Sequence, residues 1–283
     1  MSERGRSLDL GSIAVAVVNA APDAVFVLDD GGLILVVNDE AERMFGYRRD
    51  ELIGQSIECL VPDDVRSHHA GHRRSFAAAP SRRSMGKVEV PARRKDGGEL
   101  WIAVALSPLE IDGRKLVVSS ARDVSERREM QERLRYLGSH DALTALYNRA
   151  YFDEEIARLE RGRVVPVSLI MADLDGLKQV NDGLGHAAGD ELLKRAASVL
   201  RSAFRGEDVV ARLGGDEFSV VLPGMGVDDL DLAIARIREA ASAADIALSI
   251  GFATAFESKS IVRTLQLADQ AMYADKSARR TPR

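Results

Sequence analysis

The segment from Asp123 to Arg135 divides the sequence, because it differs in character from the chain on either side. It reads DVSERREMQERLR, carries charge at most positions and contains no glycine or proline. Met130, Leu134 and Leu137 follow one another at intervals of four and three residues, which predicts a helix with a narrow apolar seam. The seam is too short to distinguish a solvated linker helix from a parallel coiled coil between two copies. Either form separates two folding units.

Length and composition agree with two units of ordinary size. A chain of 283 residues with 46% hydrophobic and 29% charged residues is long enough and apolar enough to bury two cores. The net charge of -5 provides no overall cationic field for a nucleic acid polymer or an anionic membrane. The single cysteine, Cys59, cannot form an intrachain disulfide. No apolar run approaches the roughly 18 residues of a membrane span, and we expect a cytoplasmic protein.

The region before the dividing segment predicts a small antiparallel sheet. Short strand-like runs bounded by turn sequences occur at residues 24–28, 33–37, 88–93, 100–106 and 115–119. Two helical stretches, residues 39–45 and 48–53, separate the first two runs from the last three. This arrangement suits a small α+β module of the sensory type.

The region after the dividing segment predicts a βαββαβ order. The expected elements are a helix at 149–160, a strand at 167–172, a helix at 187–204, a hairpin of 209–212 and 218–222, a helix at 230–242, a strand at 247–253 and a helix at 261–279. This order is the ferredoxin-like arrangement. The predicted fold class is therefore α+β, with two domains joined by a helical linker.

Carboxylates follow directly on the predicted strand 167–172. The apolar run ends at Ala172 and continues as Asp173-Leu174-Asp175, so a buried strand presents carboxylates at the edge of its sheet. Hard oxygen ligands in such a position suit Mg²⁺. An Asp-x-Asp pair by itself is more often a solvated turn or a helix cap, so the metal interpretation depends on a second element.

The second element is the predicted hairpin tip, Gly214-Gly215-Asp216-Glu217. Two glycines stand where a tight hairpin turn needs positive φ, and two acidic residues follow them. Alone, this is a common turn with solvated acids. In a βαββαβ sheet the first strand and this hairpin are neighbours, so Asp173 and Asp216 can converge while a phosphate chain lies against the glycine backbone. Together the two elements predict a metal-bound nucleotide.

The C-terminal region resembles the GGDEF family of diguanylate cyclases from about Asp141 to Arg280. The matching motifs are GGDEF at 214–218, DALTALYNR at 141–149, the spacing of Asn181, His186 and Asp190, SIGFA at 249–253, and ADQAMYADK at 268–276. The resemblance implies a ferredoxin-like domain that condenses two GTP into cyclic di-GMP and releases two pyrophosphates.

The resemblance also implies a metal site and catalytic residues. Mg²⁺, or Mn²⁺, would be held by Asp173, the carbonyl of Leu174 and Asp216, with Glu217 assisting. Asp216 would also be the base for the ribose 3′-hydroxyl, and Lys178 would stabilise charge on the phosphates in the transition state. These roles agree with the general logic of metal-assisted phosphoryl and nucleotidyl transfer.

The same resemblance implies how the triphosphate is bound. Gly214 and Gly215 would leave the backbone open to phosphate, while Lys276 and Arg280 would bind it from the last helix. The sequence lacks a glycine that the family usually has just before Arg280. Arg279 could therefore take the place of Arg280.

Base recognition can be argued from hydrogen bonding. Guanine offers two adjacent donors on its Watson–Crick edge, so the carboxylate of Asp190 is a natural acceptor, and the amide of Asn181 can serve a neighbouring edge. The alternative for both residues is helix capping. For His186, substrate contact as in the family and a capping or packing role both remain open.

Two further expectations concern regulation and assembly. Arg205 and Asp208 form an R-x-x-D sequence just before the hairpin, where many members of the family bind cyclic di-GMP as a feedback inhibitor. The alternative is a surface ion pair. Each catalytic domain presents one GTP, so joining two requires two domains face to face and hence a homodimer.

Residues 12–125 resemble a PAS domain, a module that senses ligands, light, oxygen or redox state. The supporting motifs are NDEA at 38–41, FGY at 45–47, RKDG at 94–97 and RDVSER at 122–127. The expected organisation is a PAS sensor domain over 12–125, a helical linker over 126–140 and a GGDEF domain over 141–283.

The ligand of this PAS-like region is open. His69 falls near the position that binds iron in haem-containing relatives, but three histidines within five residues are more typical of a solvated helix. For Cys59 we expect a small buried apolar role. Phe26 and Trp101 are expected in the core.

Two other functions are compatible with these residues. One is a degenerate GGDEF domain that binds GTP or cyclic di-GMP without catalysis. The other is a nucleotidyl cyclase of related fold that closes a ring on one nucleotide. The intact set of Asp173, Lys178, Asn181, Asp190 and Asp216 favours the diguanylate cyclase.

Overall fold

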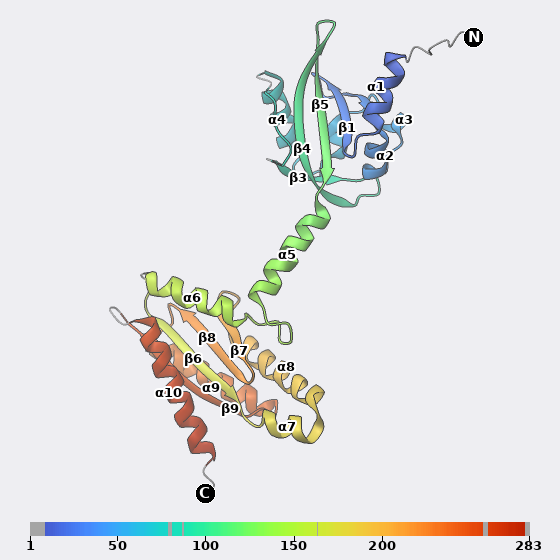
Figure 1. Cartoon of the computed structure of the whole chain (residues 1–283). Helices are drawn as coiled ribbons and strands as arrows, with labels where there is room; N and C mark the ends of the chain where they lie inside the picture. Colours follow the sequence, from blue (N-terminus) through green and yellow to red (C-terminus); the bar gives the residue numbers. More distant parts are fainter. Residues whose placement is uncertain (1–8, 79–80, 87, 163, 257–259, 281–283) are drawn as a thin grey trace, which may run out of the picture. The chain divides into compact units, whose positions relative to one another are not determined.

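The computed structural model describes residues 9–78, 81–86, 88–162, 164–256 and 260–280. The chain divides into two compact units between Gln131 and Glu132. The division lies within the helix α5, Ser125–Ser139 (Figure 1). Within the described residues, no helix combines the length and apolarity needed to cross a membrane.

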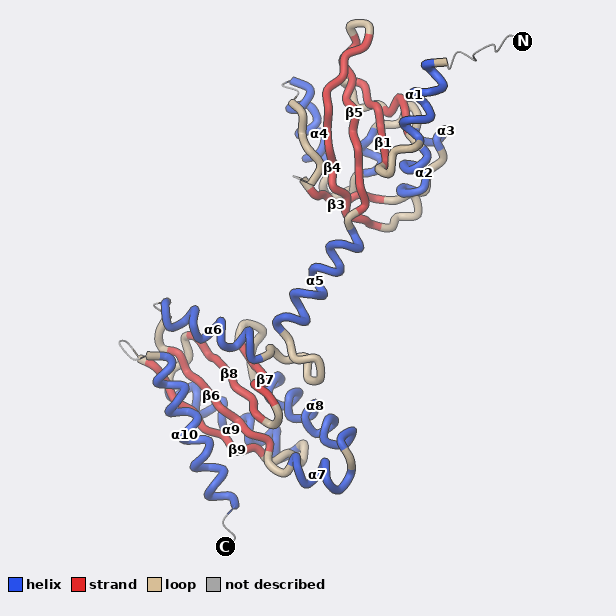
Figure 2. Tube along the Cα trace, viewed as in Figure 1, coloured by secondary structure: helices blue, strands red, loops and turns tan. Residues whose placement is uncertain are grey.

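The N-terminal unit contains a five-stranded antiparallel sheet of order β2-β1-β5-β4-β3 (Figure 2). The strands are β1 (Ala24–Asp29), β2 (Ile34–Val37), β3 (Glu89–Arg93), β4 (Glu99–Ile111) and β5 (Arg114–Asp123). All five strands were expected, although β4 and β5 are longer than the predicted runs. The helices are α1 (Leu10–Asn19), α2 (Asp39–Phe45), α3 (Arg49–Leu52), the 3₁₀ helix η1 (Ile57–Leu60) and α4 (Arg66–Ala78).

A buried asparagine fixes the start of α2. The side-chain oxygen of Asn38 accepts hydrogen bonds from the backbone N–H of Ala41 at 3.0 Å and of Val25 at 2.9 Å. It therefore caps α2 and joins it to β1 at the same time. Gly46, with φ of 75°, ends the helix in the left-handed conformation that glycine adopts readily.

The expectation that Trp101 belongs to the core is wrong, whereas Phe26 is buried as expected. Side chains alternate between the two faces of a strand, and Trp101 lies on β4 next to Ile102, which is buried. Trp101 remains 37% exposed, and the guanidinium of Arg128 lies 3.7 Å from its ring centroid. The tryptophan therefore supports the beginning of α5.

The C-terminal unit contains a four-stranded antiparallel sheet of order β7-β8-β6-β9, as expected for the ferredoxin-like arrangement. Its strands are β6 (Val167–Leu174), β7 (Val209–Gly214), β8 (Glu217–Pro223) and β9 (Leu248–Ala255). Its helices are α6 (Arg149–Arg161), α7 (Leu177–Leu184), α8 (His186–Ser202), α9 (Val227–Ala243) and α10 (Ile261–Arg280). The helix α7 was not predicted.

The central strand β6 is buried along its whole length. Ile170 and Ala172 belong to a core shared with α8 and α9, whereas Leu169 and Met171 belong to a core shared with α6 and α10. Helices thus cover both faces of the sheet. Any polar side chain at the end of β6 is consequently held in a rigid frame.

Candidate active site

The site begins where β6 ends. Asp173 is 4% exposed and lies opposite Glu217 of β8 on one side and Ser249 of β9 on the other. The next carboxylate, Asp175, accepts hydrogen bonds from the hydroxyl of Ser249 at 3.0 and 2.9 Å. The two carboxylates predicted at this strand end therefore have different partners.

Lys276 pairs with Asp173. The lysine Nζ, on α10, lies 2.6 Å from the Oδ2 atom of the carboxylate, and both side chains are largely buried. The other oxygen, Oδ1, is buried and has no hydrogen-bond partner among the described residues. A buried carboxylate oxygen without a partner is costly, so the site is prepared for a cation or a hydrogen-bond donor.

The electrostatic surroundings of Asp173 agree with this deficit of positive charge. Burial raises the pKa of Asp173 above its ordinary value of 3.8, and the charges of Asp216 and Asp175 raise it further. The hydrogen bond and charge of Lys276 oppose these effects without outweighing them. The single positive charge of Lys276 does not neutralise the negative charges of Asp173, Asp175 and Asp216.

The tip of the β7–β8 hairpin meets the end of β6, as the sequence predicted. The backbone N–H of Leu174 donates to the carbonyl of Asp216 at 2.9 Å. Gly214 and Gly215 have φ of 146° and 53°, and no neighbouring atom would lie within 4 Å of a Cβ added at either position. Asp216 is half-buried and Glu217 is exposed. The tip therefore brings Asp216 beside Asp173 and leaves open backbone next to both.

Arg212 supports the hairpin tip from β7. Its guanidinium donates to the carbonyl of Gly215 at 2.8 and 3.1 Å and to the carboxylate of Asp141 at 3.1 and 3.3 Å. The same carboxylate accepts from the backbone N–H and the hydroxyl of Thr144 at 2.9 and 2.6 Å. Sequence reasoning missed this support, because nothing local in the sequence joins residues 71 positions apart.

The residues predicted to bind guanine lie on α7 and α8. Asn181 is half-buried, whereas Asp190 and His186 are exposed. A Cβ placed on Gly189 would lie 1.9 Å from the side-chain oxygen of Asn181, so only glycine leaves room for the amide at this helix contact. The N-caps of α7 and α8 are Gly176 and Gly185, without side-chain capping bonds. Capping therefore does not account for Asn181, Asp190 or His186.

The other predicted residues lie around the same strand end or on the surface. Lys178 is exposed in the first turn of α7. Arg279 pairs with Asp275 at 3.2 Å, and the side chain of Arg280 lies outside the part of the chain that the structure describes. The buried carboxylate of Asp208 accepts from the backbone N–H of Arg205 at 2.9 Å, and the arginine side chain is exposed.

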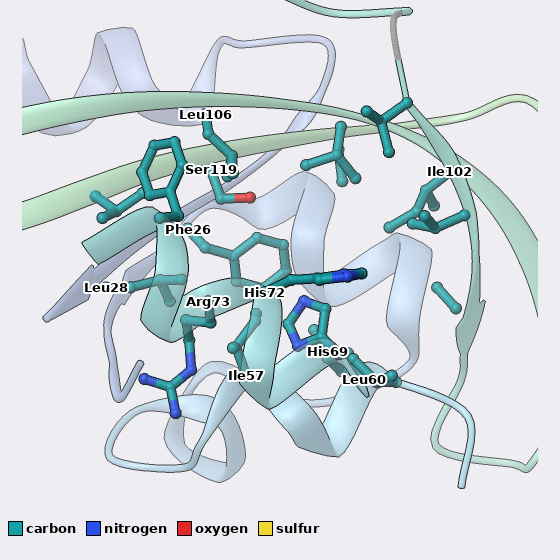
Figure 3. A pocket seen from close by; sticks show the side chains of 18 of the residues that line it. Phe26, Leu28, Ile57, Leu60, His69, His72, Arg73, Ile102, Leu106 and Ser119 are labelled. Carbon is teal, nitrogen blue, oxygen red and sulfur yellow. The ribbon is translucent and has the colours of Figure 1, made fainter. Parts of the chain in front are cut away.

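The N-terminal unit holds the predicted residue His69 at the wall of a cavity (Figure 3). Its Nδ1 atom is buried 3.6 Å from Glu58, without a hydrogen bond. Burial lowers the pKa of His69, against the opposing effect of Glu58. A neutral imidazole in an apolar wall suits haem iron, and the haem assignment stays a prediction. Cys59 is half-buried against the core, and burial raises the pKa of its thiol.

Comparison with known families decides the identity of the C-terminal unit. Residues 138–282 match the family model described as diguanylate cyclase, GGDEF domain, and residues 14–124 match the PAS fold. The chain belongs to the GGDEF family of diguanylate cyclases. Its N-terminal unit is a PAS domain, as the sequence resemblance implied.

Known relatives agree with this assignment. The chain is 34% identical over 223 residues to the probable diguanylate cyclase DgcE of Escherichia coli, which covers 77% of this chain and 20% of the relative. It is 32% identical over 191 residues to the diguanylate cyclase DgcM of Escherichia coli, covering 64% of this chain and 47% of the relative. The chain thus spans about a fifth to a half of the length of these relatives.

A solved structure shows the same fold for the C-terminal region. The coiled coil and GGDEF domain of DgcB from Caulobacter crescentus, in complex with c-di-GMP, superposes with a TM-score of 0.51 and 30% sequence identity. The superposition covers 55% of this chain and 89% of that one.

The residues at the end of β6 fit the divalent metal that is typical of this family. Among the described residues, no three His, Cys, Asp or Glu side chains form a group that could hold a metal ion by themselves. Mg²⁺ is commonly bound by only one or two carboxylates together with substrate phosphates. Asp173, with its unpartnered oxygen, and Asp216, whose backbone carbonyl accepts from the Leu174 N–H, supply such a pair.

Proposed function

We propose that the C-terminal unit condenses two GTP into cyclic di-GMP and releases two pyrophosphates, under control of the PAS domain. The observation that carries the proposal is the unpartnered oxygen of Asp173, buried beside Lys276 and next to the Asp216 turn. This arrangement combines an acidic metal site with glycine backbone that a phosphate chain can approach.

Asp173, the Leu174 carbonyl and Asp216 would hold Mg²⁺ or Mn²⁺, with Glu217 assisting from the exposed side of the turn. The bound metal neutralises charge on the triphosphate and lowers the pKa of the attacking hydroxyl. Asp216 accepts the proton of the ribose 3′-hydroxyl. The Leu174 N–H donates to the Asp216 carbonyl, so the backbone of Asp216 is anchored to the central strand.

Cationic side chains bind and stabilise the phosphates. Lys276 reaches the site from α10, and its position 2.6 Å from Asp173 keeps the ammonium at the strand end. Lys178 extends from the first turn of α7 and stabilises charge that develops in the transition state. Arg280 follows Lys276 by one helical turn on α10 and binds the outer phosphates. Arg279 is already paired with Asp275. We therefore assign phosphate binding to Arg280 rather than to Arg279.

Guanine is selected by α7 and α8. Asp190 accepts the two donors of the Watson–Crick edge, Asn181 serves the neighbouring edge, and His186 contacts the substrate from the start of α8. The packing of Asn181 over Gly189 orients the amide before substrate arrives.

Two copies of the chain must meet, because each unit offers one GTP site and the product joins two nucleotides. Arg205 is exposed on a turn that Asp208 stabilises, so its guanidinium is accessible to the product as an inhibitor. Substituting Arg205→Ala should leave initial rates unchanged and relieve product inhibition. Identical inhibition curves for the two proteins would contradict this role.

The decisive experiment is chromatography of the products formed from GTP and Mg²⁺ by the wild type and by Asp216→Ala. The proposal requires cyclic di-GMP from the wild type and at least a hundredfold lower rate in the variant. Nucleotide binding without turnover would indicate a degenerate binding domain. A cyclic mononucleotide product would indicate the single-nucleotide cyclase, and full turnover by Asp216→Ala would overturn the mechanism.

A further inference from the structure

The PAS domain contains a partly open cavity of about 380 Å³ between the inner face of its sheet and the helix α4 (Figure 3). Small-molecule sites commonly measure about 300–1,000 Å³. Protein cores, in contrast, are packed so closely that few voids exceed the size of a water molecule. A hollow of this size therefore has room for a small molecule.

The wall of the cavity is mainly hydrocarbon. It includes Phe26 and Leu28 from β1, Ile102 and Leu106 from β4, Ile57 and Leu60 from η1, and Phe76 from α4. Apolar cavities of this kind stay dry and bind apolar molecules. With about 30 Å³ for each small group, the volume accommodates a chain of about a dozen carbon atoms.

Two regions of the cavity wall differ in charge. At the first, Arg73 donates to Glu58 at 2.8 Å and to the carbonyl of Asp30 at 3.4 Å, and the carboxylate of Asp29 accepts from Leu33. The guanidinium of Arg73 is thus already paired with a carboxylate of the protein.

The second region contains an unbalanced cation. The guanidinium of Arg83 lies 5.7 Å from the ring centroid of Phe76, and no ion pair joins it to a carboxylate of the described chain. The arginine is exposed, whereas Phe76 is 8% exposed and forms part of the cavity wall. A permanent positive charge therefore stands where apolar wall meets solvent.

We propose that this cavity binds an unbranched carboxylate of about a dozen carbons, with its chain along the apolar wall and its carboxylate on Arg83. Arg83 donates hydrogen bonds to the head group, and the chain fills the space between Phe26 and Leu106. Ser119 presents its hydroxyl to the same hollow (Figure 3). The proposal names the ligand class for the sensory role proposed above, and binding can be measured without reference to cyclase activity.

The test is calorimetric titration of the delipidated full chain with dodecanoate and with the uncharged dodecan-1-ol. Arg83→Ala should weaken dodecanoate binding roughly ten- to hundredfold, because charged hydrogen bonds are lost, and leave dodecan-1-ol binding unchanged. The matched control is Arg82→Ala, which removes an exposed arginine that is not part of the cavity wall. Its affinity for both probes should equal that of the wild type.

A second variant tests the cavity itself. Val117 lines the hollow from β5, and Val117→Phe should abolish binding of both probes by filling the space. If this variant does not fold, the Arg83 comparison decides alone. The proposal is overturned if the wild type does not bind dodecanoate, or if Arg83→Ala binds it equally well. A Soret band that His69→Ala removes would likewise overturn it in favour of haem. None of these outcomes bears on whether the wild type makes cyclic di-GMP.

Discussion

Arg212 joins Asp141, at the beginning of the catalytic unit, to the hairpin tip that carries Asp216. One guanidinium contacts the carboxylate of Asp141 at 3.1 Å and the carbonyl of Gly215 at 2.8 Å. Because Gly215 directly precedes Asp216, any displacement of residue 141 is transmitted to the position of the proposed base. This places Arg212 in a positioning role.

Replacing Arg212 by lysine should lower kcat while changing KM little. Lysine supplies one point charge and cannot span the two acceptors that the planar guanidinium reaches. A shift of about 1 Å in a catalytic group can cost on the order of a hundredfold in rate, so we expect a loss of about ten- to hundredfold. Steady-state kinetics with GTP and Mg²⁺ measure it. Arg161→Lys, at an exposed site at the end of α6, is the control and should match the wild type.

The contact between Asp141 and Arg212 predicts that the stability of the fold depends on pH. Burial raises the pKa of Asp141, but hydrogen bonds from Thr144 and Arg212 outweigh it and hold this pKa below the ordinary 3.8. The ionised carboxylate therefore stabilises the fold above the unfolded-state pKa, and this contribution disappears as the pH falls through the lower folded-state value. Urea unfolding of wild type and Asp141→Asn should show a stability difference at pH 7 that shrinks below about pH 4. A difference independent of pH would contradict an electrostatic origin.

Gly189→Ala should raise KM for GTP at least tenfold. The new methyl group would collide with the Asn181 side chain, 1.9 Å away, and displace the amide from its orientation. Alanine is favoured over glycine within a helix by about 1 kcal/mol, which offsets part of the cost of this close contact. Gly183→Ala is the control, because no neighbouring atom would lie within 4 Å of its Cβ. Equal KM values for the two variants would show that the orientation of Asn181 does not affect GTP binding.

Sequence patterns predicted most of the fold, because most elements have strong hydrophobic periodicity. β6 is mainly apolar up to Ala172, and the long helix α8 has a clear amphipathic pattern. The short helix α7 was missed because it is polar and lies among glycines at positions 176, 183 and 185. Trp101 was misassigned because residue type was given more weight than its place in the alternation of β4.

The sequence predicted those parts of the candidate site whose residues lie in local motifs. The convergence of Asp173 and Asp216 followed from strand order alone. The Lys276–Asp173 pair and the Arg212–Asp141 support join residues about 100 and 71 positions apart, and no local signal identifies such partners. The cavity wall that includes His69 likewise combines residues from η1, α4 and the four strands β1, β3, β4 and β5.

The apolar seam of α5 predicts dimer-dependent activity. Met130, Leu134 and Leu137 remain 56%, 60% and 50% exposed within one chain, which leaves the seam available to a second copy. Leu134→Glu should weaken self-association and lower specific activity in parallel, because like charges would meet at the seam. Sedimentation velocity and product formation over a range of protein concentration measure both. Gln131→Glu adds the same charge outside the seam and should change neither, and a monomeric variant with full activity would contradict the proposed dimer.

Four aromatic rings in successive contact connect the end of α5 to the C-terminal unit. His140 lies 4.0 Å from the ring centroid of Tyr136 and 4.7 Å from that of Tyr147, which in turn stacks on Tyr151 at 3.9 Å. Tyr147 also bonds through its backbone to Val210 and Arg212 of β7, so the stack is continuous with the strand that leads to the active-site turn.

His140→Ala removes two of the three ring contacts and should destabilise the catalytic unit by about 1–3 kcal/mol, at about 0.5–1.5 kcal/mol for each aromatic pair. His140→Phe retains a ring and should recover most of this loss. Thermal unfolding of the full chain measures the effect, with Tyr273→Ala as the control because Tyr273 is 69% exposed on α10. If the stack also transmits motion of α5, His140→Ala should uncouple cyclase output from the state of the PAS domain while His140→Phe preserves the coupling. If both variants matched the wild type in thermal stability and in coupling, the rings would neither stabilise the unit nor transmit a signal.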